Sequence, residues 1–314
     1  MNPFPYANDN KRYHTLSYEN ARHGVKLQKA VLDAGCTCPN LDGTKGTGGC
    51  IYCAGGSGYF TESAAVPIAR QLDNEFVRIH AKNPKAGAIA YFQAHTNTYA
   101  PISVLRSLFE TALAHEGVRG LAIATRADCL PPEVLDLLAE LNGKTALTVE
   151  LGLQTVSDKT AREINRCHDF SSFLEGYAAL KERHIRVTVH LIDGLPGETA
   201  EQMISSARTL GQLRPDGVKI HLLHVIRGTP LCELYERGEY APLTCEAYVD
   251  TVVRQLEVLP QETVIERLTG DGDRRSLVAP LWSRDKLLVL GSIDKLMAEW
   301  DTWQGKLFER QENT

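Results

Sequence analysis

The sequence lacks any apolar run that approaches the length of a membrane-spanning helix, which needs about 18 or more apolar residues. Residues 1–24 also lack the apolar core of a secretion signal. Positive charge is not in excess, because 34 Lys and Arg face 39 Asp and Glu, for a net charge of −5. These absences predict a cytoplasmic protein without a membrane partner. They also exclude an overall basic surface for nucleic acids, while leaving a local basic patch open.

Low-complexity segments and linkers are absent too, so the 314 residues fit one large domain or two smaller ones. Segments typical of strands alternate with segments typical of helices. Six strand–helix units in this order predict parallel strands with right-handed crossovers, as in an open barrel. The expected strands are 25–32, 88–93, 121–125, 146–151, 186–192 and 217–225. The expected helices are 66–82, 102–115, 131–141, 170–184 and 199–213, with helical segments to about residue 259.

The alternation breaks after Pro260, where residues 263–268 look like a lone strand and residues 286–299 like a helix. We therefore expect an α/β core domain over residues 1–259, with the fold of a partial (β/α)6 TIM-like barrel. Residues 260–314 are expected to form a short α+β extension that packs on this core.

Cysteines are concentrated in the glycine-rich segment 36–53, which contains Cys36, Cys38, Cys50 and Cys53. Thiolates grouped in this way, without a secretory context, usually hold a metal. Three alternatives remain: a closed zinc site with all four cysteines, a four-thiolate iron–sulfur cluster that moves single electrons, or a three-thiolate cluster with one iron open to a ligand. A CxC pair followed by CxxC after eleven residues fits no simple zinc finger, but the spacing does not decide among the three.

Several expected strands have one polar and one apolar face. Side chains alternate across a strand, and helices cover the outside of an α/β barrel, so the polar faces should line the lumen. Barrel interiors are normally filled by branched apolar residues, so a polar lumen predicts a cavity for a polar ligand. Hydrogen-bonded core groups or a wet edge strand would explain the pattern without a ligand. The polar positions are Tyr91, Gln93, Thr148, Glu150, Thr188, His190, Lys219 and His221.

The cysteine segment resembles that of radical S-adenosylmethionine (SAM) enzymes, whose usual motif is CxxxCxxC. Its longer gap, between Cys38 and Cys50, resembles the subgroup related to the catalytic subunit of Elongator, above all the YhcC/YtqA-like proteins. Further matching segments follow in order: ELGLQT (150–155), INRCH (164–168), HLIDGLPGET (190–199), KIHLLHVIRGT (219–229) and RLTGDGDRRSLVAPLW (267–282). The resemblance covers residues 10–308 and implies the partial (β/α)6 barrel of these enzymes.

The resemblance also implies cofactors. A [4Fe–4S] cluster would be bound by Cys38, Cys50 and Cys53, and SAM would occupy the fourth iron. One-electron cleavage of SAM would give methionine and a 5′-deoxyadenosyl radical that abstracts a substrate hydrogen. Because the subgroup does not require a cysteine at position 36, Cys36 is interpreted as a non-ligand.

Further site residues are implied by the same resemblance. Tyr52 would lie against the adenine of SAM, and Gly194 and Leu195 would form a turn under it. Gln93 and His95 occupy the positions of a GGE-like motif that binds the methionine amino group. Glu150 and Gln154 would contact ribose or methionine, and Arg166 would pair with the methionine carboxylate. The candidates that would face substrate are His190, Lys219 and His221.

Two function classes remain at this point. One is a radical enzyme, which would need an electron donor such as flavodoxin or ferredoxin. Similarity to Elongator implies the side chain of a wobble uridine in tRNA as its substrate, with a peptide or a small molecule as alternatives. The other class is a non-catalytic binding module that carries a metal or a cluster. A patch for tRNA would use Arg267, Arg274, Arg275, Arg284 and Lys286, although Asp271, Asp273 and Asp285 are interspersed among them.

Overall fold

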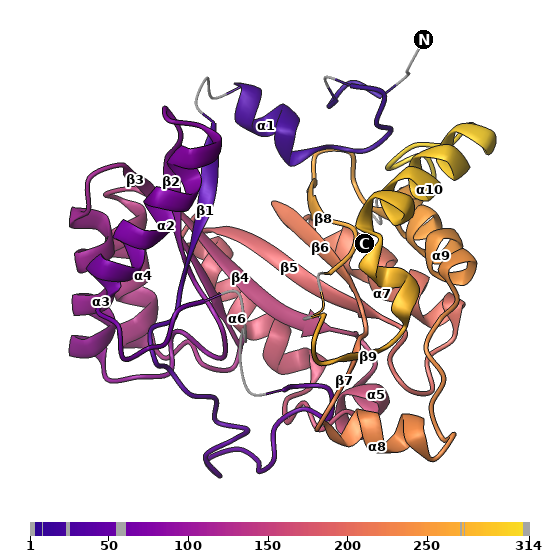
Figure 1. Ribbon diagram of the computed structural model, residues 1–314, viewed down its shortest axis with the longest axis horizontal. Coiled ribbons are helices and arrows are strands. Elements are labelled where there is room, and N and C mark those ends of the chain that lie inside the picture. Colours follow the sequence, from indigo (N-terminus) through magenta and orange to yellow (C-terminus); the bar gives the residue numbers. More distant parts are fainter. Residues whose placement is uncertain are drawn as a thin grey trace.

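The structure, a computed structural model, describes residues 4–7, 9–22, 26–54, 61–270, 272 and 274–309. Its centre is a curled sheet of seven parallel strands in the order β1-β2-β3-β4-β5-β6-β8 (Figure 1). The strands are β1 (Leu27–Leu32), β2 (Gly87–Phe92), β3 (Val118–Thr125), β4 (Ala146–Gln154), β5 (Arg186–Asp193), β6 (Gly217–Leu222) and β8 (Val264–Arg267).

Helices cover the outer face of the curl (Figure 1). Side-chain caps define where several of them begin, as in α7, where Thr199 and Gln202 form a capping box. The helices are α1 (Leu16–Arg22), α2 (Ile68–Lys82), α3 (Ile102–Ala114), α4 (Pro132–Asn142), α5 (Asp158–Glu163), α6 (Phe170–Glu182), α7 (Ala200–Leu213), α8 (Pro230–Glu236), α9 (Cys245–Val258) and α10 (Lys286–Glu299).

The hydrophobic core lies between the sheet and these helices. Phe92 of β2 meets Phe109 of α3 edge to face, with 5.0 Å between ring centroids, and both rings are buried. Leu138 of α4 and Leu210 of α7 are also fully buried in this layer. The apolar faces of the strands therefore point outward to the helices, and this leaves their polar faces for the lumen.

The α/β alternation and the partial barrel predicted from the sequence are confirmed. The prediction of a lone strand over 263–268 is wrong, because β8 pairs in parallel with β6, with Val218 opposite Ile265. The helix α9 forms one more crossover before it, so the sheet gains a seventh strand. Residue 25, which was expected to begin the first strand, lies outside the described residues.

The open edge of β8 is covered by the N-terminal segment. Thr15 bridges to Ile265, whose backbone N–H donates to the His14 carbonyl at 2.8 Å. Gln304 accepts from the His14 N–H at 2.8 Å and donates to the Thr263 carbonyl at 2.9 Å. Both ends of the chain thus protect this edge from pairing with another chain.

The C-terminal part adds a small second sheet. β9 (Leu277–Ala279) pairs antiparallel with β7 (Val225–Ile226), which follows β6. Leu281–Arg284 then forms a 3-10 helix before α10. The division at residue 260 stays a prediction. In the described part of the chain, no helix combines the length and apolarity that crossing a bilayer would need.

Tight packing of α6 on the loop after β3 gives a test of the fold. A Cβ at Gly176 would lie 2.3 Å from the Ala127 carbonyl oxygen, so Gly176→Ala should lower the free energy of unfolding by about 1–3 kcal/mol. A Cβ added at Gly291 of α10 would have no atom within 4 Å. Gly291→Ala should therefore be neutral or stabilise by up to about 1 kcal/mol. Urea unfolding of both variants checks this, and equal effects would contradict the packing.

Candidate functional site

The loops that follow the strands meet at the carboxyl edge of the sheet, at the bottom of Figure 1. Parallel strands bring all such loops to one edge, which is where α/β barrels carry their sites. The cysteine segment 36–53 follows β1, residues 93–98 follow β2, and residues 155–168 follow β4. The sequence motifs therefore come together because of the topology.

The cysteine segment is docked on the INRCH segment. Asn165 donates from Nδ2 to the carbonyls of Thr47 and Gly49, at 2.9 and 2.7 Å. In return, Asn40 donates from Nδ2 to the Asn165 carbonyl. Gly46 permits this close approach, since a Cβ there would lie 2.3 Å from Asn40 Oδ1.

The four cysteines differ in burial. Cys50 is buried, Cys38 is half-buried and Cys53 is exposed. Cys36 instead packs in the main hydrophobic core, and its interpretation as a non-ligand stays a prediction. Among the described residues, no three His, Cys, Asp or Glu side chains are close enough together to hold a single metal ion. In an iron–sulfur cluster each cysteine ligates a different iron, so the three thiols need not converge on one point.

Backbone strain is concentrated beside this segment. His95, Gln154, Asn165 and Cys167 have φ of 59°, 73°, 55° and 58°, a region that residues other than glycine rarely adopt. Strained residues of this kind gather at binding sites, where the surrounding structure holds them. The four belong to three different motifs of the sequence, and all lie at the carboxyl edge.

Three of the predicted SAM-binding residues have buried polar atoms without a hydrogen-bond partner in the described structure: His95 Nε2, Gln154 Oε1 and Arg166 Nε. His95 is held by its Nδ1, which donates to the Cys36 carbonyl at 3.2 Å. Arg166 is held by its Nη2, which donates to the Gly152 carbonyl at 2.6 Å. Unsatisfied buried groups are rare in proteins, so these atoms fit contacts to a bound polar molecule.

Arg166 is only 6% exposed, so the guanidinium is not a solvated helix charge. A Cβ at Gly152 would lie 2.7 Å from Gln154 Nε2 and 3.1 Å from Arg166 Nη2, so the glycine leaves room for both side chains. Gln93 is half-buried, and its backbone N–H donates to the Leu32 carbonyl at 3.0 Å.

Tyr52 packs with Leu195 in a second, smaller hydrophobic cluster. Burial, together with the nearby Cys50, raises the pKa of the Tyr52 hydroxyl well above its usual value, so this hydroxyl stays protonated. Gly194 precedes Leu195 with φ of 87°, and its carbonyl accepts from the Tyr240 hydroxyl at 2.8 Å. The predicted adenine-binding residues therefore lie together beside the cysteine segment.

The lumen holds a network of buried charges around Glu150. Its Oε1 accepts from Lys29 Nζ at 2.6 Å, and its Oε2 accepts from Tyr91 and His190 at 2.8 Å each and from Lys219. Burial alone would raise the pKa of the Glu150 carboxyl, but Lys219 and Lys29 outweigh it and hold that pKa well below its usual range. Glu150 is therefore a carboxylate with both oxygens already engaged, Oε1 by one donor and Oε2 by three.

A second carboxylate completes the network. Glu266 of β8 accepts from Lys29 Nζ at 3.0 Å and from Thr188 Oγ1 at 2.8 Å. Lys29 thus connects the first strand of the sheet to the last. Neither Lys29 nor Glu266 was predicted from the sequence. Alternation along LQKAVL would have identified Lys29 as inward-facing, but Glu266 was assigned to a lone strand.

Known proteins now identify the family. The sequence model of the radical SAM superfamily matches residues 43–210, more than half of the chain. The chain belongs to the radical SAM superfamily. A model of the radical SAM C-terminal domain matches residues 215–299. The first match starts after Cys38 and includes Cys50 and Cys53, and the ligand roles of all three cysteines stay predictions.

Relatives agree with this assignment. The uncharacterized protein YtqA of Bacillus subtilis is 48% identical over 99% of this chain and 97% of its own length. Elongator complex protein 3 of Saccharomyces cerevisiae is 35% identical over 48% of this chain and 27% of that protein. The solved structure of the archaeal Methanocaldococcus infernus Elp3 superposes with a TM-score of 0.67 at 18% identity, covering 89% of this chain and 64% of that one.

The protein is therefore a radical SAM enzyme, and its resemblance to the YhcC/YtqA-like subgroup is confirmed. The superfamily implies a [4Fe–4S] cluster and SAM. The side chains present fit both groups, because they offer thiols for iron and unsatisfied buried polar atoms for a polar cofactor. The interpretation as a non-catalytic binding module is thereby set aside.

The lumen network predicts a large effect of one substitution. Glu150→Gln removes the carboxylate, which leaves Lys29 with Glu266 alone and Lys219 with only its 4.0 Å contact to Glu266, so it should lower the free energy of unfolding at pH 7 by about 3–5 kcal/mol. Because the pKa of Glu150 is depressed in the folded state, this contribution is present above the unfolded-state pKa. It is lost as the pH falls through the folded-state pKa.

Chemical denaturation from neutral to acidic pH tests this prediction. Glu140→Gln is the matched control, because exposed Glu140 makes surface ion pairs with Arg106 and Lys144 and should hardly change the unfolding midpoint. A Glu150→Gln variant as stable as the wild type at pH 7 would show that the network does not hold the lumen together.

Proposed function

We propose that Cys38, Cys50 and Cys53 each bind one iron of a [4Fe–4S] cluster and that SAM binds at the fourth iron. When bound, the pair supplies a 5′-deoxyadenosyl radical that removes a hydrogen atom from the substrate. The observation that carries this proposal is the position of the unsatisfied atoms of His95, Gln154 and Arg166 around the cysteine segment.

The chain's own residues would position the cofactor. Arg166 is suited to the methionine carboxylate, because a guanidinium forms strong charge-assisted hydrogen bonds with carboxylates. Gln154 offers Oε1 to a ribose hydroxyl or to the amino group. Tyr52 and Leu195 would enclose the adenine on their apolar side. Glu150 is the weaker candidate of the predicted set, since its carboxylate is engaged by lumen side chains.

The proposed substrate is the side chain of a wobble uridine in tRNA. This rests on the similarity to Elongator complex protein 3, which covers 48% of the chain. A reaction inside the lumen needs a base that is unstacked, and an anticodon loop presents such bases. A flavodoxin or a ferredoxin is the proposed electron donor.

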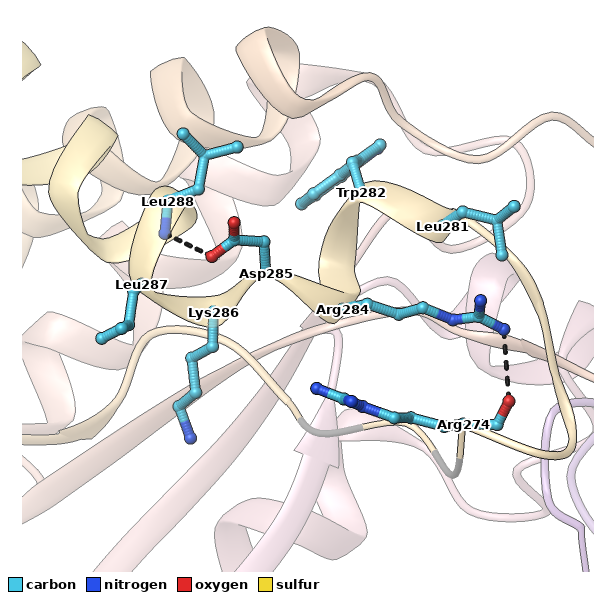
Figure 2. Close-up of a pocket in the computed structure, with 8 residues that line it drawn as sticks. All are labelled: Arg274, Leu281, Trp282, Arg284, Asp285, Lys286, Leu287 and Leu288. Carbon is cyan, nitrogen blue, oxygen red and sulfur yellow. Dashed lines mark hydrogen bonds between the residues drawn. The ribbon is translucent and has the colours of Figure 1, made fainter.

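A basic surface pocket of about 680 Å³ supports contact with RNA (Figure 2). Arg274, Arg284 and Lys286 line it, and Figure 2 shows the three side chains along one side. Asp285 also lines it, but its carboxylate caps α10 by accepting from the Leu288 N–H at 2.9 Å. Cations arranged in this way attract phosphates in a salt-dependent manner.

The patch differs from the one expected from the sequence. Arg267 does not belong to it, because it ends β8 opposite Lys219, a residue of the lumen network. Asp271 and Asp273 lie outside the described residues. Three of the five expected cations therefore line the pocket: Arg274, Arg284 and Lys286.

The cluster proposal predicts that anaerobically reconstituted protein carries about four irons and four sulfides per chain. Alanine at Cys38, Cys50 or Cys53 should abolish SAM cleavage, because each variant loses a cluster ligand. Iron analysis, absorbance and product chromatography measure this. Cys36→Ala is the control, since Cys36 packs in the core and should be dispensable for cluster and cleavage. Loss of the cluster in Cys36→Ala with retention in Cys38→Ala would reverse the assignment.

The substrate proposal predicts SAM-dependent modification of tRNA, detected by nucleoside mass spectrometry after anaerobic incubation with a reductant. It also predicts salt-sensitive tRNA binding. The double variant R274Q/K286Q should bind tRNA more weakly. The slope of log K against log salt concentration should fall in magnitude by about two, if each cation meets one phosphate. The control R106Q/R237Q removes exposed arginines outside the pocket and should bind as the wild type does. Equal binding of tRNA by both variants, without modification, would favour a peptide or a small molecule.

A further inference from the structure

Within the part of the chain that the structure describes, the charges around the lumen network do not balance. The described residues contribute three cations, Lys29, Lys219 and Arg267, against the carboxylates of Glu150 and Glu266. Both carboxylates are engaged by the two lysines. One positive charge is left over, and it belongs to Arg267.

Among the described residues, Arg267 has no partner on the lumen side of the sheet. It is the last residue of β8 and is the register neighbour of Lys219 on β6. It lies within electrostatic reach of Tyr91, His190 and His221. The guanidinium is half-buried, and within the described ranges no hydrogen bond or ion pair is formed by its nitrogens. A cation beside another cation, in a partly desolvated place, is costly unless an anion joins it.

His221 provides a second open group within electrostatic reach of Arg267. It lies two residues after Lys219 on the same face of β6, and its ring centroid is 5.1 Å from that of His190. Its Nε2 is buried and has no partner in the part of the chain that the structure describes. Burial lowers the pKa of His221 well below its usual value, so the ring is neutral and Nε2 can serve as a donor or an acceptor.

Both groups lie at the mouth of the lumen. His221 is one residue before the end of β6, and Arg267 ends β8, so they share the carboxyl edge with the cysteine segment. In the sheet order β8 and β1 are at opposite ends, and the ion pair between Lys29 and Glu266 joins these ends across the lumen. The predicted SAM-binding residues Gln154 and Arg166 belong to the β4 region instead.

We propose that Arg267 and His221 form an oxyanion subsite that binds a phosphate or carboxylate group of the substrate at the lumen mouth. The guanidinium would give two parallel hydrogen bonds to the anion, and the imidazole a third. The anion would balance the surplus charge of the network. This rests on the proposed function only in taking the lumen as the substrate chamber, and it does not depend on tRNA.

The experiment titrates the reconstituted full-length protein with inorganic phosphate and, separately, with sodium acetate, at constant ionic strength held with chloride. Isothermal calorimetry and the melting temperature report binding. Wild-type protein should show one saturable site for at least one of the two anions, and the anion that binds more tightly identifies the chemistry. Arg267→Gln should weaken that binding about tenfold or more, because the charge-assisted bonds are lost.

Controls separate this site from the rest of the protein. Arg267→Lys keeps the charge, should bind with intermediate affinity and shows that substitution here leaves the fold intact. His221→Phe should weaken binding without removing it. Arg106→Gln alters an exposed arginine that pairs with Glu110 and Glu140, and should bind as the wild type does.

Three results would overturn the proposal: no saturable site in the wild type, equal binding by Arg267→Gln, or loss of the anion site when SAM is bound, which would assign it to the cofactor carboxylate. Failure of the cluster proposal looks different, because the cysteine variants would then keep SAM cleavage while anion binding stayed unchanged.

Discussion

The ion pair between Lys29 and Glu266 joins the two ends of the sheet, and the rest of the lumen is arranged around it. The 3.0 Å contact links β1 to β8, strands that no backbone hydrogen bond connects. Glu150 stands between them on β4 and is reached from β1, β2, β5 and β6. Removing charges from water is expensive, and the return here is a fixed distance between strands that apolar packing would leave loose. Here that geometry is the curl of a sheet which does not close by itself.

The same network explains why the polar groups of the lumen are not equivalent. Lys219 and His190 each donate a hydrogen bond to Glu150, and this bond holds each side chain in one orientation. His221, two residues further along β6, is beyond the reach of that carboxylate and keeps Nε2 open. The lumen is therefore layered. The described groups around Glu150 are mutually satisfied, and the unsatisfied Nε2 of His221 lies nearer the carboxyl edge, where ligands of α/β barrels bind.

The sequence was sufficient for the elements whose signal is local. Period-two alternation correctly assigned Glu150, His190 and Lys219 to one face, and the cysteine motif identified the family and the loop. What escaped was contact between distant segments. Glu266 could not be paired with Lys29 before the curl of the sheet was known, and Arg267 was interpreted as a surface cation because nothing local distinguishes it from Arg274. The prediction that Glu150 binds the cofactor came from a motif, and a motif does not show that four other side chains donate to this carboxylate.

Preorganisation of the cysteine segment follows from how it is held. Radical chemistry requires the reacting atoms to be fixed and water to be kept away, and flexible loops do neither well. The cysteine segment is instead held by Asn165. The side-chain amide of Asn165 donates to two carbonyls of the segment, and the backbone carbonyl of Asn165 accepts from Asn40 of the segment. Asn165 itself adopts φ of 55°, a cost of about 1–3 kcal/mol that the new hydrogen bonds offset. The strained backbone at Asn165 therefore lets the loop after β4 hold the cysteine segment that follows β1. It also places the next residue, Arg166, in the buried position from which its guanidinium can meet the cofactor.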